Sequence, residues 1–324
     1  MTKITIYEYK SYEDNALAKF TANKDLKIST FAEPLSMQNI NLAAGSDGVI
    51  TLTGSPITAE VAAKFAEMGI KHYATRTIGF NHVDLAALKK HGISASHARY
   101  APDNLAEFTI TLMLMHLKKL KASIFNSLEG NYTLDGLMST ELKHQTVGVI
   151  GGSGNIGSAV INLLKGFGCN ILVYDLFKKD KSINYVDLDT LYAQSDIITL
   201  HVPASKENYH LISEKNIAKL KKAPLIVNIS RGEIINTADA LAALHSGKLS
   251  GLALDVVEGE ADVIWKKGAP QPAFYKTLQT HKDIIHTPHY AFFSSTAIFD
   301  MFKSGIMGIV LSKEGKENVY KINA

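Results

Sequence analysis

Polar residues that could do chemistry follow three short apolar runs in the second half of the chain. Arg231 comes directly after PLIVNIS, an acidic cluster follows GLALDVV, and His289 follows DIIHTP. An arginine binds a carboxylate with two parallel hydrogen bonds, and a histidine with a carboxylate beside it stays protonated near neutral pH. Such a set is what an NAD-dependent redox enzyme needs to reduce the carbonyl group of a 2-keto acid.

The acidic cluster lies in the stretch LDVVEGEADV and contains Asp255, Glu258, Glu260 and Asp262. Their spacing alone leaves open which of the four acts. Two neighbouring glutamates would also suit glycoside hydrolysis, but that interpretation leaves the alternating strand-like runs and Arg231 unexplained. We therefore expect one acid of the cluster to pair with a histidine.

Two histidines near the end of the chain, His286 and His289, are three residues apart and could be taken for metal ligands. Thr287 and Pro288 stand between them, and the residue before a proline favours extended backbone. An extended segment would point the two rings apart. The sequence therefore predicts no metal site.

A glycine pattern supplies the second chemical signal. The strand-like run TVGVI is followed by Gly152, Gly154 and Gly157, and then by a helix-like segment. In this context the first glycine allows a tight turn, the second lets the backbone approach a pyrophosphate, and the third packs helix against strand. The helix N-terminus adds free N–H donors. The pattern predicts a dinucleotide site, and an additional glycine, Gly151, predicts a turn one residue longer than usual.

The next apolar run, NILVYD, ends at Asp175, eighteen positions after Gly157. A carboxylate at that place accepts hydrogen bonds from both ribose hydroxyls and repels a 2′-phosphate, so the sequence predicts NAD as the cofactor. Lys178 and Lys179 follow closely, and they keep NADP as the alternative.

Alternating short β-branched runs and amphipathic segments must position these residues. From residue 146 the pattern predicts a doubly wound parallel sheet, in an NAD-binding Rossmann domain over residues 100–294. Five shorter runs in the first hundred residues predict a smaller flavodoxin-like α/β domain, residues 1–99 plus 295–324. The expected strands are ITIYEY, LKISTF, DGVITL, KHYATR, GISASH, TVGVIGG, NILVYD, DIITLHVP, PLIVNIS, GLALDVV and DIIHTPH.

Two long helices are expected to connect these domains. The segment 101–124 begins with a proline and an acidic first turn, and we expect one helix that crosses from the first domain to the second. A second helix, 294–315, is expected to return the chain to the first domain. Part of the apolar stretch FTITLMLMHL is more hydrophobic than one amphipathic face needs, which suggests a subunit contact.

Composition excludes several classes of protein. The chain has 324 residues, 34 basic against 31 acidic side chains and a net charge of +3, so neither nucleic acid nor membranes are expected partners. Its single cysteine, Cys169, cannot form an internal disulfide and fits a reducing cytoplasm. The N-terminus lacks the apolar core of a secretory signal, and no apolar run is long enough to cross a bilayer.

With these motifs in place, the sequence resembles the NAD-dependent D-2-hydroxyacid dehydrogenase family. It is most similar to the D-lactate dehydrogenase branch, including the enzymes of vancomycin-resistance operons. The resemblance covers nearly the whole chain. It is carried by the segments TRTIGFNHVDLAALKKHGI, YAPDNLAEFTITLMLM, VGVIGGSGNIG, GFGCNILVYD, SDIITLHVP, NISRGEIINT, GKLSGLALDVVEGE and TPHYAFFSSTA.

The resemblance implies a role for individual residues. Arg231 binds the substrate carboxylate, His289 is the acid and base, and Glu260 pairs with His289, which leaves Glu258 and Asp262 as solvated loop acids. Substrate contacts are implied for Leu52, Ile78, Gly79, Tyr100, Arg231 and His289. Besides the three fingerprint glycines, cofactor contacts are implied for Tyr100, Asn155, Ile156, Asp175, Val202, Pro203, Asn208, Ile229, Arg231 and Asp255, the last near the nicotinamide.

The implied activity is the reversible NADH-dependent reduction of pyruvate to D-lactate by a homodimer. Leu52 keeps an alternative open, because relatives that form lactate often carry a tyrosine there, whereas leucine accompanies larger substrates such as 4-methyl-2-oxopentanoate or phenylpyruvate. Glyoxylate is a further alternative substrate. An NAD-sensing protein on the same scaffold, similar to some corepressors, is the alternative that is not an enzyme.

Overall fold

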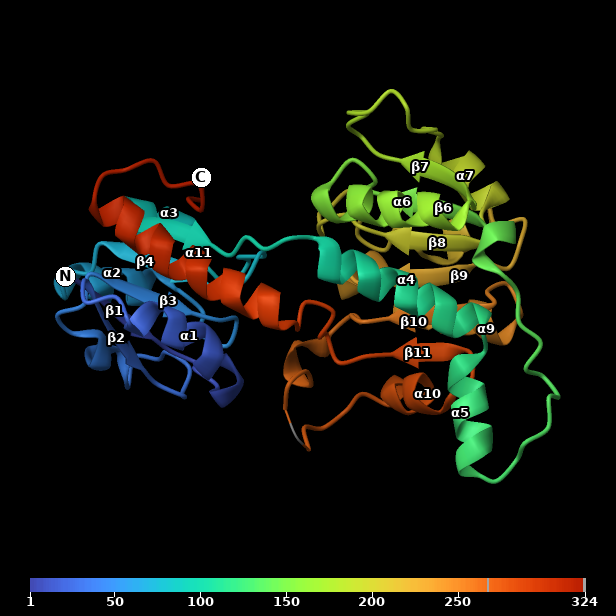
Figure 1. The fold of residues 1–324 in the computed structure, drawn as a ribbon, viewed down its shortest axis with the longest axis horizontal. Coiled ribbons are helices and arrows are strands. Elements are labelled where there is room, and N and C mark those ends of the chain that lie inside the picture. Colours follow the sequence, from blue (N-terminus) through green and yellow to red (C-terminus); the bar gives the residue numbers. More distant parts are fainter. Residues whose placement is uncertain (267, 323–324) are drawn as a thin grey trace. The chain divides into compact units, whose positions relative to one another are not determined.

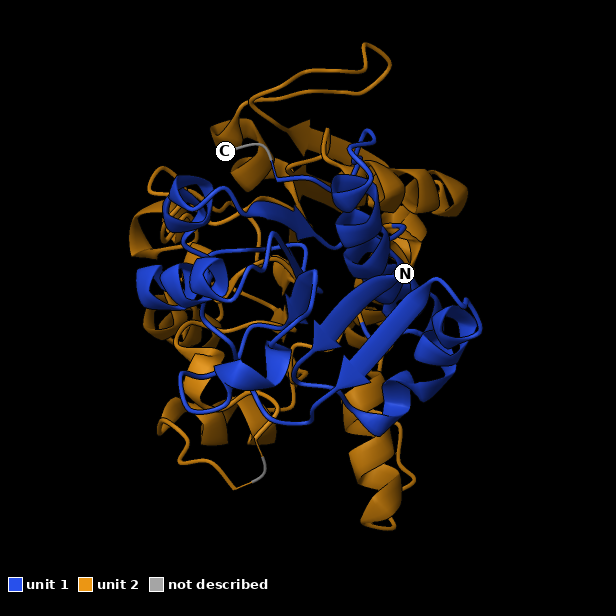
Figure 2. Cartoon of the chain, turned by 90° about the vertical axis from the view of Figure 1, so that its left-hand side faces the viewer, with its two compact units in different colours: residues 1–101, 293–324 blue, residues 102–292 orange. Residues whose placement is uncertain are grey.

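The computed structural model describes residues 1–266 and 268–322, which form two compact units (Figure 1). Unit 1 consists of Met1–Ala101 and Phe293–Ala324, and unit 2 of Pro102–Phe292 (Figure 2). The chain passes between units within two residues of the bounds that the sequence predicts for its domains. Residues 323–324, at the end of the predicted substrate domain, lie outside the described residues.

Unit 1 is built on a five-stranded parallel sheet with the order β2-β1-β3-β4-β5. This is the flavodoxin-like order of a doubly wound sheet, as predicted. The strands are β1 (Thr2–Ile6), β2 (Leu26–Thr30), β3 (Gly48–Thr51), β4 (His72–Thr75) and β5 (Ser94–His97). Its helices are η1 (Ser11–Glu13), α1 (Asp14–Thr21), η2 (Ile40–Ala43), α2 (Ala59–Glu67), α3 (Leu85–Lys90) and α11 (Ser295–Lys313).

Helix α11 packs on β3, β4 and β5, and α1 lies beside it. Gly48 permits this close packing, because a Cβ there would collide with the side chain of Ile309. A separate apolar cluster includes Phe65 of α2 and Leu88 of α3. The C-terminal helix is thus part of the core of unit 1.

Unit 2 has a six-stranded parallel sheet with the order β7-β6-β8-β9-β10-β11. Its strands are β6 (Thr146–Ile150), β7 (Asn170–Tyr174), β8 (Ile197–Leu200), β9 (Leu225–Asn228), β10 (Gly251–Leu254) and β11 (Ile284–His286). The helices are α4 (Asp103–Leu117), α5 (Leu120–Leu128), η3 (Leu142–His144), α6 (Asn155–Phe167), α7 (Leu188–Gln194), α8 (Glu214–Ile217), η4 (Gly232–Ile234), α9 (Thr237–His245), η5 (Glu260–Asp262) and α10 (Phe274–Thr280).

The strands of unit 2 are apolar because helices cover the sheet. Every residue of β8, β9 and β10 is buried, as expected for central parallel strands. The register pairs Leu254 of β10 with Asn228 of β9 and with His286 of β11. Three neighbouring strands therefore end at the same level, and the polar residues that follow them emerge at one edge of the sheet.

The prediction of one helix over 101–124 was wrong. Two helices replace it, α4 and α5, because Lys119 adopts a left-handed conformation with φ of 50° between them. The helix does not cross between units either, since α4 begins at Asp103 and lies wholly in unit 2.

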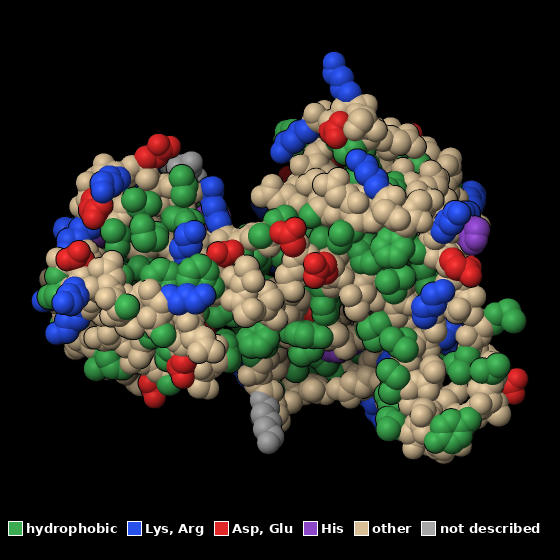
Figure 3. All heavy atoms as spheres, in the orientation of Figure 1, with side chains coloured by type: hydrophobic (Ala, Val, Ile, Leu, Met, Phe, Trp, Pro, Cys, Tyr) green, Lys and Arg blue, Asp and Glu red, His purple; other side chains and the backbone are tan. Residues whose placement is uncertain are grey.

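Much of the apolar surplus of α4 packs inside unit 2, and the suggested subunit contact stays a prediction. The helix lies against α6, β9 and β10 and buries Leu105, Ile110, Leu112 and Met113. Exposed apolar side chains gather instead on α5 and the loop that follows it, at the lower right of Figure 3. In the part of the chain that the structure describes, no helix is both long and apolar enough to span a membrane.

The buried histidine of α4 predicts a loss of stability in mild acid. Burial lowers the pKa of His116 from 6.5 to about 4, and burial lowers that of His201 to about 3. Between pH 6.5 and pH 4 the unfolded chain therefore binds more protons than the folded chain. The contribution of the neutral histidine to the free energy of unfolding is fully present above pH 6.5 and is lost as the pH drops toward 4. We expect a loss of about 3 kcal/mol from His116 alone over this window.

Urea denaturation at pH 7 and pH 5 measures this loss. The variant His116→Gln should show a smaller difference between the two pH values than the parent protein. The matched control is His144→Gln, because His144 is exposed and should leave the difference unchanged. Equal pH dependence in the parent and in His116→Gln would contradict the assignment to this side chain.

Candidate active site

Arg231 follows β9 and is held by the turn that carries it. Its Nη1 donates to the carbonyl of Ser230 at 2.6 Å, and its own carbonyl accepts from the Asn228 side chain at 2.8 Å. The turn lies directly on the loop after β10, because a Cβ at Gly232 would collide with the backbone of Val257. The glycine after the arginine therefore brings the β9 turn against the segment that leads to Glu260.

Glu260 and His289 meet, as the resemblance implied. Glu260 Oε1 lies 2.6 Å from His289 Nδ1, and Glu260 Oε2 accepts from the backbone N–H of Val257 at 2.8 Å. The side chains are 14% and 25% exposed, so solvent reaches the imidazole more than the carboxylate. When Nδ1–H donates to Glu260, Nε2 is the ring nitrogen that is left to bind or release a second proton, on the side of the ring away from the carboxylate.

Asp255, implied as a cofactor contact, follows β10 and is hydrogen-bonded to the segment that carries His289. Its carboxylate is buried and accepts three hydrogen bonds from the His289 segment, at 2.6 Å from the Thr287 hydroxyl and at 3.0 Å from the N–H groups of Tyr290 and Ala291. Its carbonyl accepts from the N–H of His289 at 2.8 Å. These hydrogen bonds form the Asp255 clamp, in which the carboxylate and the backbone carbonyl of Asp255 together hold residues 287–291.

This clamp supports a strained backbone. His289 has φ of 53°, in the left-handed region that residues other than glycine rarely adopt. Burial raises the pKa of Asp255, whereas the hydrogen bonds from Thr287, Ala291 and Tyr290 lower it. The hydrogen bonds hold the loop in a backbone conformation that is unfavourable for a histidine.

Sequence analysis did not single out Trp265, which lies against His289. The indole Nε1 donates to the backbone carbonyl of His289 at 3.2 Å, and the two rings lie 5.6 Å apart. Trp265 is the only tryptophan in the sequence, five positions after Glu260, and these two facts were the available signal. Its hydrogen bond to the His289 carbonyl adds to the bond from the His289 N–H to Asp255, so both backbone groups of His289 are held.

The expectation that Glu258 is a solvated loop acid was wrong. Its Oε1 accepts from the Tyr209 hydroxyl at 3.0 Å and lies 2.8 Å from His210 Nε2. His210 has φ of 52°, and its ring stacks on that of Tyr209. Glu258 therefore ties the loop after β10 to the loop after β8, whereas Asp262 is exposed, as expected.

The glycine turn after β6 differs in one detail from the prediction. The left-handed glycine is Gly151, with φ of 90°, and not Gly152. A Cβ at Gly152 would meet Val173 and Ile161, and a Cβ at Gly157 would meet the Gly151 backbone. Gly154 begins α6 without a side-chain cap, so the first N–H groups of this 13-residue helix are available to an anion. This geometry fits a dinucleotide phosphate.

Asp175 lies at the end of β7, beside the glycine turn. Its Oδ2 accepts from the N–H of Ser153 and its Oδ1 from the N–H of Phe177, each at 2.8 Å. Each carboxylate oxygen has a second lone pair, so the side chain can still accept from ribose hydroxyls. Asn155 and Ile156, also predicted cofactor contacts, form the first residues of α6.

The remaining predicted cofactor residues of unit 2 lie in the loops after β8 and β9. Asn208 closes the first loop, since its Nδ2 donates to the Pro203 carbonyl at 2.6 Å and its Oδ1 accepts from Ser205 N–H at 2.8 Å. Val202 is half-buried next to Pro203, and Ile229 is buried directly after β9.

The predicted substrate residues of unit 1 follow β3, β4 and β5. Leu52 comes directly after β3, and Tyr100 is half-buried after β5. In the turn after β4, the Thr77 hydroxyl donates to the Gly79 carbonyl at 2.6 Å, and the Ile78 carbonyl lies 3.2 Å from His97 Nδ1. The carbonyls of this turn are thus occupied within unit 1.

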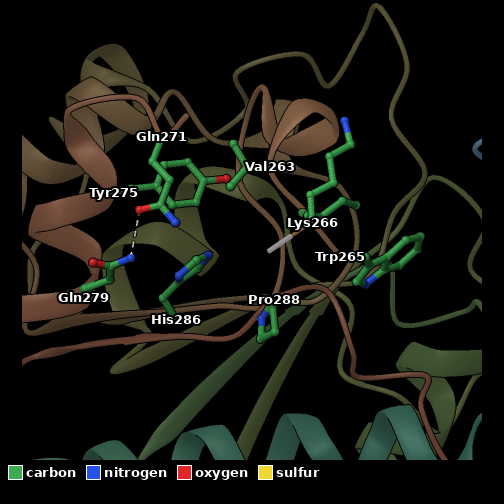
Figure 4. Close-up of a pocket in the computed structure, with 9 residues that line it drawn as sticks. Val263, Trp265, Lys266, Gln271, Tyr275, Gln279, His286 and Pro288 are labelled. Carbon is green, nitrogen blue, oxygen red and sulfur yellow. Dashed lines mark hydrogen bonds between the residues drawn. The ribbon is translucent and has the colours of Figure 1, made fainter. Parts of the chain in front are cut away.

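A cavity of about 350 Å³ in unit 2 lies beside the histidine loop, shown in Figure 4. None of the predicted site residues lines it. Gln279 donates to Gln271 at 3.1 Å across its rim. The lining residues are Val263, Ile264, Trp265, Lys266, Gln271, Tyr275, Gln279, His286 and Pro288.

Comparison with known proteins places these residues in a family. The family model described as D-isomer specific 2-hydroxyacid dehydrogenase, NAD binding domain, matches residues 110–291. A D-specific alpha-keto acid dehydrogenase of Enterococcus faecalis is 35% identical over 301 residues, 92% of each chain. A D-lactate/D-glycerate dehydrogenase of Pediococcus acidilactici is 34% identical over 307 residues, also 92% of each chain.

Solved structures agree with this match. The structure of a D-2-hydroxyisocaproate dehydrogenase is 30% identical, covers 100% of both chains and has a TM-score of 0.93. The predicted fold class, the enzyme class and NAD as the cofactor are confirmed. The chain belongs to the NAD-dependent D-2-hydroxyacid dehydrogenase family, in its D-lactate dehydrogenase branch.

Proposed function

We propose that this enzyme reduces pyruvate to D-lactate, reversibly, and that Arg231, Glu260 and His289 carry the reaction. The observation that supports the proposal most directly is the 2.6 Å contact between Glu260 Oε1 and His289 Nδ1. It occurs at the edge of the sheet where β9, β10 and β11 end together, and β9 leads into Arg231. A carboxylate binder and an oriented proton donor therefore follow β9 and β11, the two strands on either side of β10.

The three side chains have different tasks in the proposed reaction. Bound NADH supplies the hydride to C2 of the keto acid. His289 Nε2 gives its proton to the carbonyl oxygen as the oxygen gains charge, and Glu260 stabilises the imidazolium and fixes the ring. Arg231 holds the substrate carboxylate with two hydrogen bonds and helps to polarise the carbonyl. We assign further carboxylate contacts to the backbone amides of Ile78 and Gly79.

The choice of pyruvate over larger acids turns on the pocket residue Leu52. The relatives are named for different substrates, one for lactate and glycerate and another for 2-hydroxyisocaproate. The second candidate is therefore a preference for a bulkier 2-keto acid such as 4-methyl-2-oxopentanoate or phenylpyruvate. Leucine at position 52 is the observation that favours it.

Initial rates of NADH oxidation with pyruvate, 4-methyl-2-oxopentanoate, phenylpyruvate and glyoxylate, measured in parallel on the purified protein, decide between these substrates. The highest kcat/KM with pyruvate supports D-lactate formation, and a higher value with a bulkier acid supports the second candidate. The configuration of the product is checked with a D-specific enzymatic assay. Absence of turnover with all four acids would contradict the proposal and favour an NAD-sensing role.

Replacing Glu260 by glutamine is expected to lower kcat by about 10²-fold. Glutamine Oε1 can still accept from the Val257 N–H, but its Nε2 then faces His289 Nδ1 as a donor, which favours the neutral ring over the imidazolium. Steady-state kinetics at saturating NADH measure the loss. The matched control is Glu258→Gln, which changes an acid of the same loop that bonds Tyr209 and His210 and not His289. Equal losses in the two variants would argue against the assigned pair.

We also propose a homodimer that forms through α5 and the loop after it, the α5 patch. Its large apolar side chains are too exposed for a helix that packs only within unit 2 (Figure 3). A partner would cover Leu120, Ile124, Phe125, Leu128, Tyr132, Leu134 and Met138. A cytoplasmic location is proposed with it, because Cys169 is a free thiol.

Light scattering coupled to size exclusion tests the dimer. The parent protein is expected at twice the mass of one chain at micromolar concentration, and Leu128→Asp, a change at a side chain that is 78% exposed, is expected to give monomers. The matched control is Leu176→Asp, because Leu176 is 79% exposed but lies outside the α5 patch. A monomeric parent would overturn the proposal.

A further inference from the structure

Glu8 and the turn Leu52–Ser55 meet at a particular place in the sheet of unit 1. Glu8 follows β1 and Leu52 follows β3, and the strand order β2-β1-β3-β4-β5 reverses between these two strands. In open α/β sheets, ligands bind in the crevice beyond the carboxyl ends of the strands at such a reversal. The contacts that fix these two loops therefore bear on what the crevice accepts.

The Glu8 carboxylate accepts three hydrogen bonds from this turn. Oε2 accepts from the N–H of Leu52 at 2.8 Å and from the Ser55 hydroxyl at 2.5 Å, and Oε1 accepts from the N–H of Gly54 at 2.9 Å. The turn is closed by the Ser55 N–H, which donates to the Leu52 carbonyl at 3.3 Å. Hydrogen bonds to an ionised acceptor are short and strong, so the carboxylate fixes the turn backbone at both ends.

Glu8 is itself fixed by its surroundings. Its backbone has φ of 57°, its N–H donates to the Glu33 carbonyl at 3.1 Å, and its carbonyl accepts from Arg76 Nη2 at 3.1 Å. Arg76 is fully buried and also bonds both oxygens of Glu13. A left-handed residue that is not glycine, held by its neighbours at a ligand-binding edge, points to a functional constraint.

The turn lies very close to this acid and is held there. A Cβ at Gly54 would lie 2.5 Å from Glu8 Oε1, so glycine is what lets the backbone come so close. The Ser55 side chain is fully buried and also accepts from the N–H of Leu35 at 2.8 Å. Any shift of the turn would break several hydrogen bonds at once.

We propose that Glu8 is a positioning residue that holds Leu52 in place and thereby sets which 2-keto acid the enzyme prefers. It acts through the backbone of the turn and does not touch the substrate. This inference rests on the proposed function, in which Leu52 forms part of the substrate pocket. A pocket wall held at one position distinguishes acids that differ by methylene groups, and a mobile wall does so poorly.

The test is Glu8→Gln, which keeps the size of the side chain but presents an NH₂ group to one of the three donors. We expect the ratio of kcat/KM for 4-methyl-2-oxopentanoate to that for pyruvate to change by about tenfold. NADH affinity should stay as in the parent, because the cofactor residues of unit 2 are untouched. The matched control is Glu33→Gln, an exposed acid of the same unit, which should leave the ratio unchanged.

A double-mutant cycle separates positioning from general destabilisation. If Glu8 acts through Leu52, Glu8→Gln made in a Leu52→Ala background should no longer change the ratio. Amide hydrogen exchange of Leu52 and Gly54 supplies a readout that does not depend on activity, and both amides should exchange faster in Glu8→Gln. Should Glu8→Gln fail to fold, Ser55→Ala removes one donor and is expected to shift the ratio less, in the same direction.

The outcomes distinguish this inference from the proposed function. A parent protein that turns over no 2-keto acid would overturn the proposed function, whereas an active parent with an unchanged ratio in Glu8→Gln would overturn only the role of Glu8. A change of the ratio that persists in the Leu52→Ala background would also overturn it, because Glu8 would then act by another route.

Discussion

Replacing His289 by glutamine is expected to lower kcat for keto-acid reduction by about 10²- to 10⁴-fold, the contribution usual for a positioned general acid. Glutamine has no ionisable proton to give to the developing alkoxide. It also cannot reproduce the contact of Nδ1 with Glu260 at 2.6 Å together with a second donor atom on the far side of a ring. Stopped-flow measurement of NADH oxidation at saturating keto acid gives the chemical step directly.

The loss should be confined to catalysis. NADH binding, followed by its fluorescence, should match the parent, because the glycine turn and Asp175 lie on other strands of the sheet. The matched control is His286→Gln, three positions earlier, where burial lowers the pKa of the imidazole and so disfavours a proton donor near neutral pH. If His286→Gln lost as much turnover as His289→Gln, the acid–base role would be assigned to the wrong residue.

Arg231→Lys is expected to raise the KM for the keto acid by about 10- to 100-fold with a smaller effect on kcat, because a lysine cannot form two parallel hydrogen bonds to a carboxylate. A shorter, point-like cation would also lose the present contact of Nη1 with the Ser230 carbonyl. The charge is retained, so a uniform attraction for anions should survive. Binding of the unreactive analogue oxamate to the NADH complex, measured by calorimetry, tests this without turnover.

Two outcomes would count against this role of Arg231. One is oxamate affinity equal to that of the parent. The other is a fall in kcat with unchanged KM, which would assign the arginine to the transition state alone. Because Gly232 packs against the β10 loop, circular dichroism and thermal unfolding of Arg231→Lys should first show that the turn survives.

The parts of the fold and site that could be predicted are those that depend on strand ends. Buried parallel strands appear in the sequence as runs of β-branched residues. Their register brings Asn228, Leu254 and His286 to one level. The residues that follow these runs can therefore be predicted to lie close together, even when the conformations of the loops are not known. The same reasoning located the glycine turn and Asp175, because a β-strand, a glycine turn and a helix are contiguous in sequence.

The rest depends on contacts between distant segments, which no local pattern records. Asp255 bonds residues more than thirty positions away, and Glu258 bonds a loop nearly fifty positions earlier. The break at Lys119 follows from a left-handed backbone in a helix-favouring sequence. Likewise, Gly151 and Gly152 cannot be ranked from spacing, since only the collisions of a built Cβ show what each glycine permits.

The position of Trp265 has a spectroscopic consequence. The sequence has one tryptophan, and its indole bonds the carbonyl of His289 while half of the side chain is exposed. Intrinsic fluorescence excited in the indole band therefore comes from a single site beside the acid–base pair. Changes in emission wavelength on adding a ligand would report the polarity around the histidine loop itself, with no label and no background from other tryptophans.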